Sequence, residues 1–198
     1  MTIFYELYGN LYLNLTNRCT NACEFCIRDY DDGIDKNTDL WIDHEPSLSE
    51  IIADSKKFDI NKYPEVVLCG YGEPLIKLKE AVGICKYLKE NFSVKIRVNT
   101  NGLASHFHKR NVPKELKGLV DIISISLNHK DKKAYNELCH PDCGEEAFDE
   151  ILDFTREAKK YIPRVIMSVV DVIDKEDINA CRKIAENLGA EFRVREKI

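Results

Sequence analysis

The chain has 198 residues, of which 44% are hydrophobic and 32% are charged, and its formal net charge is -5. This length predicts a single domain spanning residues 1–198, and the composition indicates neither a disordered chain nor a membrane protein. The net negative charge argues against a nucleic-acid partner held by a broadly basic face. Residues 1–10 carry no signal-peptide pattern and no apolar run reaches membrane-spanning length, so we expect a cytoplasmic protein without a membrane partner.

Short apolar segments alternate with segments of helical spacing along the whole chain. Leu11, Leu13 and Leu15 alternate with polar residues, as in a strand with one apolar face. In chain order, the pattern predicts strands over 11–16, 66–69, 94–99, 122–128, 165–170 and 191–195. Helices are predicted from a capping box at 47–50, over 75–90, around 114–117, over 145–160 and over 175–188.

This alternation of about six strands and five helices predicts an α/β protein with a parallel sheet and right-handed crossovers. Six units are too few for a closed eight-stranded barrel. An open, partial (β/α)6 barrel with parallel strands and its helices outside therefore fits the pattern. A flat, doubly wound sheet would show the same alternation, so the periodicity alone does not decide between them.

The second face of the predicted strands is polar, although parallel strands are normally apolar on both faces. We therefore expect the following polar groups to line a lumen that serves as a site: Tyr12, Asn14, Thr16, Lys95, Arg97, Asn99, Ser124, Ser126, Asn128, Arg193 and Arg195. The alternative places Lys95, Arg193 and Arg195 at strand ends in water, because buried unpaired charge is rare.

Eight cysteines in a chain without a leader indicate reduced thiols or metal ligands rather than disulfides. Cys19, Cys23 and Cys26 are spaced CxxxCxxC just after the first predicted strand. Iron-sulfur clusters are ordinarily held by four thiolates, so a triplet predicts a cluster with one iron open to a small-molecule ligand. A zinc site completed by His44 or a distant cysteine is the alternative. The other cysteines are interpreted as structural: Cys69, Cys85, Cys139, Cys143 and Cys181.

With Phe25 directly before its last cysteine, the triplet resembles the signature of the radical S-adenosylmethionine (SAM) superfamily. The segment 70–74, Gly-Tyr-Gly-Glu-Pro, resembles the glycine-glutamate motif of that superfamily, and 99–102 and 124–128 resemble later SAM-binding positions. The resemblance implies a partial (β/α)6 barrel in which the triplet holds a 4Fe-4S cluster and SAM chelates its open iron. The SAM contacts that it implies are Phe25, Gly70, Tyr71, Gly72, Glu73, Asn99, Ser124 and Ser126.

Physical chemistry agrees with these implied contacts. Glu73 offers a negative partner to the cationic amine of SAM, and the glycines on either side of Tyr71 let the backbone approach a ligand closely. Taken alone, the glycines would indicate only a tight turn from strand to helix. Arg97 is a candidate for the SAM carboxylate or for an acidic substrate, with a structural salt bridge as the alternative. Further candidates for these contacts are Asn14, Asn128, Arg193 and Arg195.

The resemblance implies an oxygen-sensitive enzyme. Its cluster would reductively cleave SAM to a 5'-deoxyadenosyl radical, which would abstract hydrogen from an unidentified substrate. A flavodoxin- or ferredoxin-type protein would supply the electron, and a partner, a second copy forming a homodimer, or a large substrate would close the barrel. The alternatives are a glycyl-radical-enzyme activase acting on a partner protein and a non-catalytic iron-sulfur and SAM-binding module.

Residues 5–16 and 135–139 are similar to a group of small radical SAM proteins associated with TatD-type nucleases, which implies such a nuclease as a partner. The cluster loop is expected over 17–46. Within it, five aspartates predict a solvated segment: Asp29, Asp31, Asp32, Asp35 and Asp39. Cys139 and Cys143 would need Cys69 or another partner to hold an auxiliary cluster.

Overall fold

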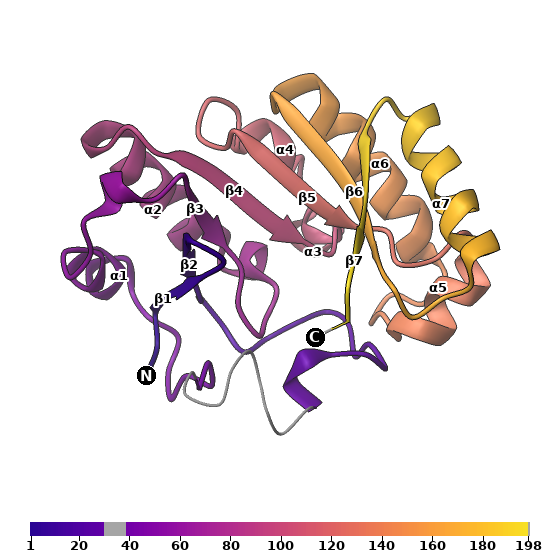
Figure 1. The fold of residues 1–198 in the computed structure, drawn as a ribbon, viewed down its shortest axis with the longest axis horizontal. Helices are drawn as coiled ribbons and strands as arrows, with labels where there is room; N and C mark the ends of the chain where they lie inside the picture. The colour runs from indigo at the N-terminus through magenta and orange to yellow at the C-terminus, as the bar shows by residue number, and fades with distance from the viewer. Residues whose placement is uncertain (30–38, 198) are drawn as a thin grey trace.

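The computed structural model describes residues 1–29 and 39–197, which form a seven-stranded sheet flanked by helices (Figure 1). The strands occupy the sheet in chain order: β1 Phe4–Leu7, β2 Asn10–Leu13, β3 Glu65–Leu68, β4 Lys95–Thr100, β5 Ile122–Ser126, β6 Arg164–Val170 and β7 Glu191–Arg195. Strands β2 to β7 are parallel, and β1 does not pair with β7. The predicted six parallel strands and the open sheet are confirmed.

Strand β1 is a seventh strand that the sequence pattern did not predict. It pairs antiparallel with β2 through a turn at Tyr8 and Gly9, whose φ angles are 49° and 72°. Two successive positive φ angles match the right-handed twist of a short hairpin. The prediction missed this strand because its four residues are too few to establish an alternating pattern.

The helices also follow the predicted order, with two additions. They are α1 Leu48–Ser55, α2 Leu78–Asn91, α3 Ala104–His108, α4 Val112–Glu115, α5 Lys132–Cys139, α6 Glu146–Tyr161 and α7 Lys175–Asn187. Three short 3-10 helices add η1 Ile27–Asp29, η2 Ile60–Lys62 and η3 Pro74–Lys77. The capping box is confirmed, because Ser47 N donates to Glu50 Oε2 at 2.9 Å and Glu50 N donates to Ser47 Oγ at 3.3 Å. Helices α3 and α5 were not predicted, and the helix expected over 75–90 divides into η3 and α2.

The two faces of the sheet have different compositions. On the outer face, Leu13, Val98 and Ile123 are fully buried in the core that the helices complete. The strand register aligns Tyr12 with Val67 and Arg97, so these residues share the opposite face. We call this the inner face. It carries Tyr12, Asn14, Val67, Cys69, Lys95, Arg97, Asn99, Ser124, Ser126, Arg164, Ser168, Arg193 and Arg195, and also the apolar Ile122, Ile166 and Val170. The predicted polar face therefore exists on the side away from the helices.

Two further predictions concern the acidic segment and membrane-spanning helices. Asp31, Asp32 and Asp35 of the predicted acidic segment lie outside the described residues, so the expected cluster loop over 17–46 is described only at its two ends. No helix within residues 1–29 and 39–197 combines the length and apolar character needed to cross a membrane.

Candidate functional site

The cysteine triplet lies on the loop that follows β2, at the carboxyl end of the parallel strands (Figure 1). All three thiols are half-buried and free. Cys26 N donates to the carbonyl of Cys23 at 3.0 Å, which closes a tight turn between the last two cysteines. The structure thus places the triplet where parallel α/β sheets bind ligands, beyond the carboxyl ends of the strands.

Each thiol of the triplet has a nitrogen donor beside its sulfur atom. Asn101 Nδ2 lies 3.8 Å from Cys19 Sγ, and Asn21 Nδ2 lies 4.0 Å from Cys23 Sγ. Arg28 Nε donates to Cys26 Sγ at 3.2 Å. Donors around a sulfur ligand stabilise its negative charge and tune a bound cluster. Asn101 and Arg28 were not among the predicted site residues, although both lie within or next to the sequence motifs.

The ionisation of two thiols depends on their surroundings. Burial, together with the nearby charge of Glu73, raises the pKa of Cys19 to about 12. A hydrogen bond from Cys139 lowers the pKa of Cys23. Since metal ligands are thiolates, a bound metal must offset the cost of ionising Cys19. Metal binding at this loop should therefore release protons.

Cys139 is a buried neighbour of the triplet, and the sequence predicted it to be a structural cysteine, with an auxiliary cluster as the alternative. Besides its bond to Cys23, its sulfur accepts from Asn128 Nδ2 at 3.5 Å. The backbone fixes this contact, because Ala22 N donates to the carbonyl of Cys139 at 3.1 Å. The end of α5 therefore holds the loop that carries Cys23.

A buried tyrosine of α5, Tyr135, also holds the cysteine loop. Asn21 Nδ2 donates to Tyr135 Oη at 2.8 Å, and Asn101 Nδ2 donates to Asn21 Oδ1 at 3.3 Å. These bonds connect the cysteine loop to the turn after β4 on one side and to α5 on the other. The triplet is thus positioned by tertiary contacts rather than by its own loop alone.

The zinc alternative finds no support in the described part of the chain. No three Cys, His, Asp or Glu side chains among residues 1–29 and 39–197 converge to ligate one metal ion. His44 is engaged elsewhere, with its Nε2 2.8 Å from Glu50 Oε1 at the start of α1. In a multi-iron cluster each thiolate binds a different iron, so the sulfurs need not meet at a point. The donor set of three thiols with neighbouring N–H groups therefore fits a cluster better than zinc.

The glycines of the turn after β3 are required by close packing. A Cβ on Gly72 would lie 2.3 Å from the carbonyl oxygen of Thr16 and 2.4 Å from that of Arg18. A Cβ on Gly70 would lie 2.0 Å from Asn14 Oδ1. The sequence predicted two roles for these glycines, close approach of a ligand and a tight turn. The structure shows that they let this turn pack against the start of the cysteine loop.

Glu73 ties the same turn to the end of β4. Its Oε1 accepts from Leu75 N at 3.0 Å and from Thr100 Oγ1 at 2.8 Å, and its Oε2 accepts from Asn101 N at 2.7 Å. Only 4% of the residue is exposed, and this burial raises the pKa of the carboxyl to about 7. The carboxylate is therefore held rigidly beside the cysteine loop, and Oε2 keeps capacity for one more donor.

Buried polar atoms without hydrogen-bond partners gather on the inner face. Among the described residues such atoms are Asn10 Oδ1, Asn14 Oδ1, Arg97 Nε, Asn99 Oδ1, Asn128 Oδ1 and Arg195 Nε. All but Asn10 are predicted site residues. Native proteins rarely leave buried polar atoms unpaired, and a bound ligand or an ordered water commonly supplies the missing partner. The inner face thus has the unsatisfied donors and acceptors expected of a polar binding site.

The arginine candidates differ in their surroundings. Arg97 Nε lies 2.9 Å from Glu65 Oε2, an ion pair whose angle falls outside that of a hydrogen bond, so the predicted salt-bridge alternative is present. Arg195 is half-buried and its Nη2 donates to Ser126 Oγ at 3.3 Å. Arg193 is exposed, as the solvent alternative expected, and so is Lys95.

The aromatic candidates lie in two environments. Tyr71 is buried against Trp41, with ring centroids 5.2 Å apart and an edge-on angle of 68°. Phe25 packs against the core between the sheet and the helices. Ser124 and Asn128 are buried on the inner face or at its end. The structure therefore gathers most predicted contacts at the carboxyl end of the inner face, with Phe25 turned toward the core.

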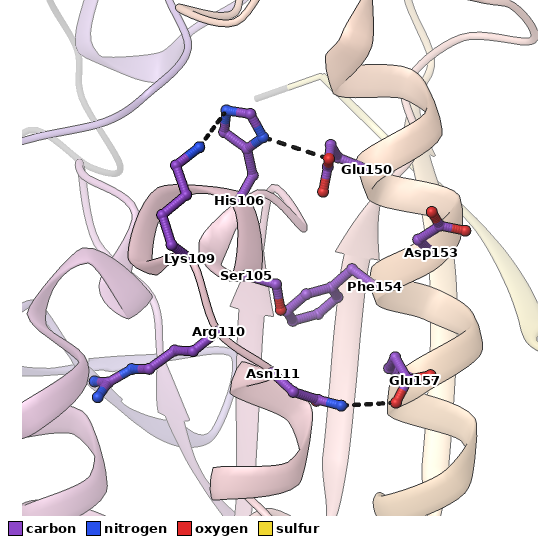
Figure 2. A pocket seen from close by; sticks show the side chains of 9 residues that line it. All are labelled: Ser105, His106, Lys109, Arg110, Asn111, Glu150, Asp153, Phe154 and Glu157. Carbon is purple, nitrogen blue, oxygen red and sulfur yellow. Dashed lines mark hydrogen bonds and ion pairs between the residues drawn. The ribbon is translucent and has the colours of Figure 1, made fainter.

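A separate hollow of about 340 Å³ lies in the helical layer, between α6 and the connection from α3 to α4 (Figure 2). Its polar groups largely satisfy one another. His106 Nδ1 lies 3.4 Å from Glu150 Oε1, and Asn111 Nδ2 donates to Glu157 Oε2 at 2.7 Å. No predicted site residue lines this hollow, so it is distinct from the candidate site.

Comparison of the sequence with known families finds a match to the radical SAM superfamily over residues 13–188. The chain is also similar to the dual-specificity RNA methyltransferase RlmN of Wigglesworthia glossinidia brevipalpis, with 30% identity over 118 residues. That match covers 56% of this chain and 29% of the relative. The chain thus spans less than a third of the length of this curated relative.

Solved structures share the fold. Streptococcus suis SuiB bound to the precursor peptide SuiA has a TM-score of 0.68 and 15% identity, covering 94% of this chain and 39% of SuiB. Methylornithine synthase (PylB) has a TM-score of 0.65 and 15% identity, and the match covers 94% of this chain and 52% of the synthase. A radical SAM methyltransferase from Sphaerobacter thermophilus has a TM-score of 0.62 and 14% identity, and the match covers 98% of this chain and 68% of the methyltransferase. At this identity the likeness shows the fold, which is the predicted open partial barrel.

Proposed function

The chain belongs to the radical SAM superfamily, and we propose that its Cys19, Cys23 and Cys26 hold a 4Fe-4S cluster with one open iron. The observation that supports this most is the position of the triplet at the carboxyl end of the sheet, where each sulfur atom has a nitrogen donor within 4.0 Å. When bound, the cluster supplies the electron that splits SAM into methionine and a 5'-deoxyadenosyl radical.

The residues of the chain would bind and orient SAM. Glu73 lies beside the cysteine loop with free capacity on Oε2, so its carboxylate is suited to the amino group of SAM. Asn99 Oδ1 is buried and unpaired on the same face, and Ser124 lies next to it in the register. We assign the remaining SAM contacts to the backbone of Phe25 and to Gly70, Tyr71, Gly72 and Ser126.

The proposed substrate is a molecule that donates a hydrogen atom to the 5'-deoxyadenosyl radical. The inner face is open along β7, so a partner, a second copy or a large substrate would exclude water from the radical. A flavodoxin- or ferredoxin-type donor would supply the electron. The TatD-type nuclease remains a predicted partner, and the extent of the domain over 1–198 remains a prediction.

Anaerobic reconstitution with iron and sulfide tests the cluster assignment. The wild-type chain should bind roughly four iron atoms, and SAM should change the electron paramagnetic resonance spectrum of the reduced protein, because it ligates the open iron. A Cys23→Ala variant should lose the cluster. The matched control is Cys181→Ala, which removes a buried cysteine of α7 outside the site and should keep the full iron content.

A reduced, loaded protein whose spectrum does not respond to SAM would contradict the proposed SAM site. Full iron content in the Cys23→Ala variant would contradict the ligand assignment instead. The two results are separable, since iron content is measured without SAM.

A further inference from the structure

Strand β7 presents two arginines to the inner face at the open edge of the sheet. The register aligns Arg193 with Ser168 and Arg195 with Val170, so both arginines point to the same side. Residues two apart on a strand are about 7 Å apart. The two guanidinium groups therefore form a short positive row along the open edge, which we call the β7 arginine pair.

Neither member of this pair has a carboxylate partner among residues 1–29 and 39–197. Arg195 Nη2 donates to Ser126 Oγ at 3.3 Å, while its Nε is buried and unpaired. The other arginines of the inner face are paired. Arg97 Nε lies 2.9 Å from Glu65, and Arg164 binds both oxygens of Glu191, with contacts of 2.9 and 2.7 Å.

An unpaired, half-buried guanidinium is costly. Burial lowers the pKa of Arg195, and the nearby positive charge of Arg193 adds to this effect. Two like charges on one face repel each other, and a buried donor without a partner loses its hydration. A bound anion would remove both costs at once through charge-assisted hydrogen bonds.

The position of the pair connects it to the cluster loop. Arg195 is near enough to Cys69 and Cys23 to interact with both electrostatically. The end of β7 and the loop that carries the triplet both lie at the carboxyl edge of the parallel strands. Arg193 is exposed and lies farther from the carboxyl edge. A ligand held by both arginines would therefore extend from the cluster side of the inner face toward solvent.

We propose that Arg193 and Arg195, with Ser126, bind a carboxylate or phosphate group of the substrate. This inference rests on the proposed function, because it places an anionic substrate beside the proposed SAM site. The same guanidinium chemistry would suit the carboxylate of SAM itself. The row of two arginines is longer than one carboxylate requires, so the substrate is the source that we favour.

Inorganic phosphate is the probe for this site. The cluster-loaded chain with SAM is melted at constant ionic strength, with phosphate replacing chloride. At a phosphate concentration about ten times Kd, the melting temperature of the wild type should rise by roughly 3–6 °C. Arg195→Gln and the double variant R193Q/R195Q should lose this rise, and Arg195→Lys should keep part of it. The matched control Lys95→Gln removes an exposed charge from the same face and should respond as the wild type does.

The affinity for SAM distinguishes the two sources of the anionic group. We expect a SAM Kd in Arg195→Gln within about twofold of the wild type. A loss of tenfold or more would overturn the proposal and assign the pair to the SAM carboxylate. Equal stabilisation of all variants by phosphate, or of none, would also overturn it. Release of 5'-deoxyadenosine without substrate, measured on the same samples, reports separately on the proposed function.

Discussion

The two faces of the sheet are built from the same strands but differ in chemistry. On β5, Ile123 faces outward and is fully buried against the helices, while the adjacent Ser124 faces inward. The outer face is apolar and belongs to one continuous core. The inner face carries most of the buried polar atoms that lack partners among the described residues. One face thus stabilises the fold, and the other keeps unsatisfied groups that a ligand can use.

The cysteine loop is held at the edge where the two faces of the sheet meet the connecting turns. The loop is fixed at the carboxyl end of the sheet by the end of α5 and by the turns after β3 and β4. The outer core is the larger buried apolar cluster of the described residues, and the inner face adds a small one made of Tyr5, Tyr12, Leu40, Val67 and Tyr71. Substitutions on the two faces should therefore separate stability from function.

The largest expected effect is on catalysis. Cys23→Ala should lower release of 5'-deoxyadenosine to background, because the cluster loses a ligand. The free energy of unfolding of the metal-free protein should change by roughly 1 kcal/mol or less, since the thiol is half-buried and makes only weak hydrogen bonds, with Cys139 and Asn21. Product analysis by chromatography and urea unfolding measure the two quantities. A stability loss as large as that of a core substitution would contradict the separation of the two faces.

Neighbouring residues of β5 provide the stability test. Ile123→Ala should reduce the free energy of unfolding by roughly 2–5 kcal/mol, because it opens a cavity in the outer core. Ser124→Ala should cost less than about 1 kcal/mol but should weaken SAM binding. Urea unfolding and equilibrium dialysis with SAM measure these effects. Similar stability losses for both variants would show that the inner face is part of the core.

Glu73 gives a pH-dependent effect of intermediate size. Its pKa of about 7 in the folded protein exceeds the ordinary value of 4.5, so the folded state holds the proton more tightly. This contribution to stability is complete below pH 4.5 and is lost as the pH rises through 7. It amounts to about 3 kcal/mol. Urea unfolding of the metal-free protein at several pH values measures it.

The control for this prediction is Glu73→Gln, which cannot titrate. The difference in unfolding free energy between the wild type and Glu73→Gln should shift by about 3 kcal/mol across this pH range. A constant difference would contradict the raised pKa. The amino group of SAM needs the carboxylate form, so SAM affinity should increase as the pH rises through 7.

The turn after β3 gives a smaller structural effect. Gly72→Ala should cost roughly 1–3 kcal/mol and lower iron content, because the new Cβ meets backbone carbonyls of Thr16 and Arg18. The matched control is Gly83→Ala on α2, where the Cβ meets only the flexible end of Leu48. That variant should retain full iron content. Equal iron content in both variants would show that the turn does not position the cysteine loop.

Much of the fold could be predicted, because short apolar segments alternate with segments of helical spacing along most of the chain and α1 begins with a complete capping box. The cysteine triplet and Glu73 could be predicted because each lies in a short local motif. Cys139 could not be assigned to the site, since only tertiary folding brings it to Cys23. The close packing of Gly72 against Thr16 was hidden for the same reason. Helix α5 was missed because it has only eight residues, of which only Tyr135 and Cys139 are buried.

The cysteine loop and the inner face should together form a site that cleaves SAM. The most direct test is to reduce the fully loaded wild-type protein anaerobically with SAM and to quantify 5'-deoxyadenosine and methionine. We expect both products to form in equal amounts in the loaded protein and neither to form in Cys23→Ala. A fully loaded, reduced protein that binds SAM but releases no 5'-deoxyadenosine would contradict the proposed function.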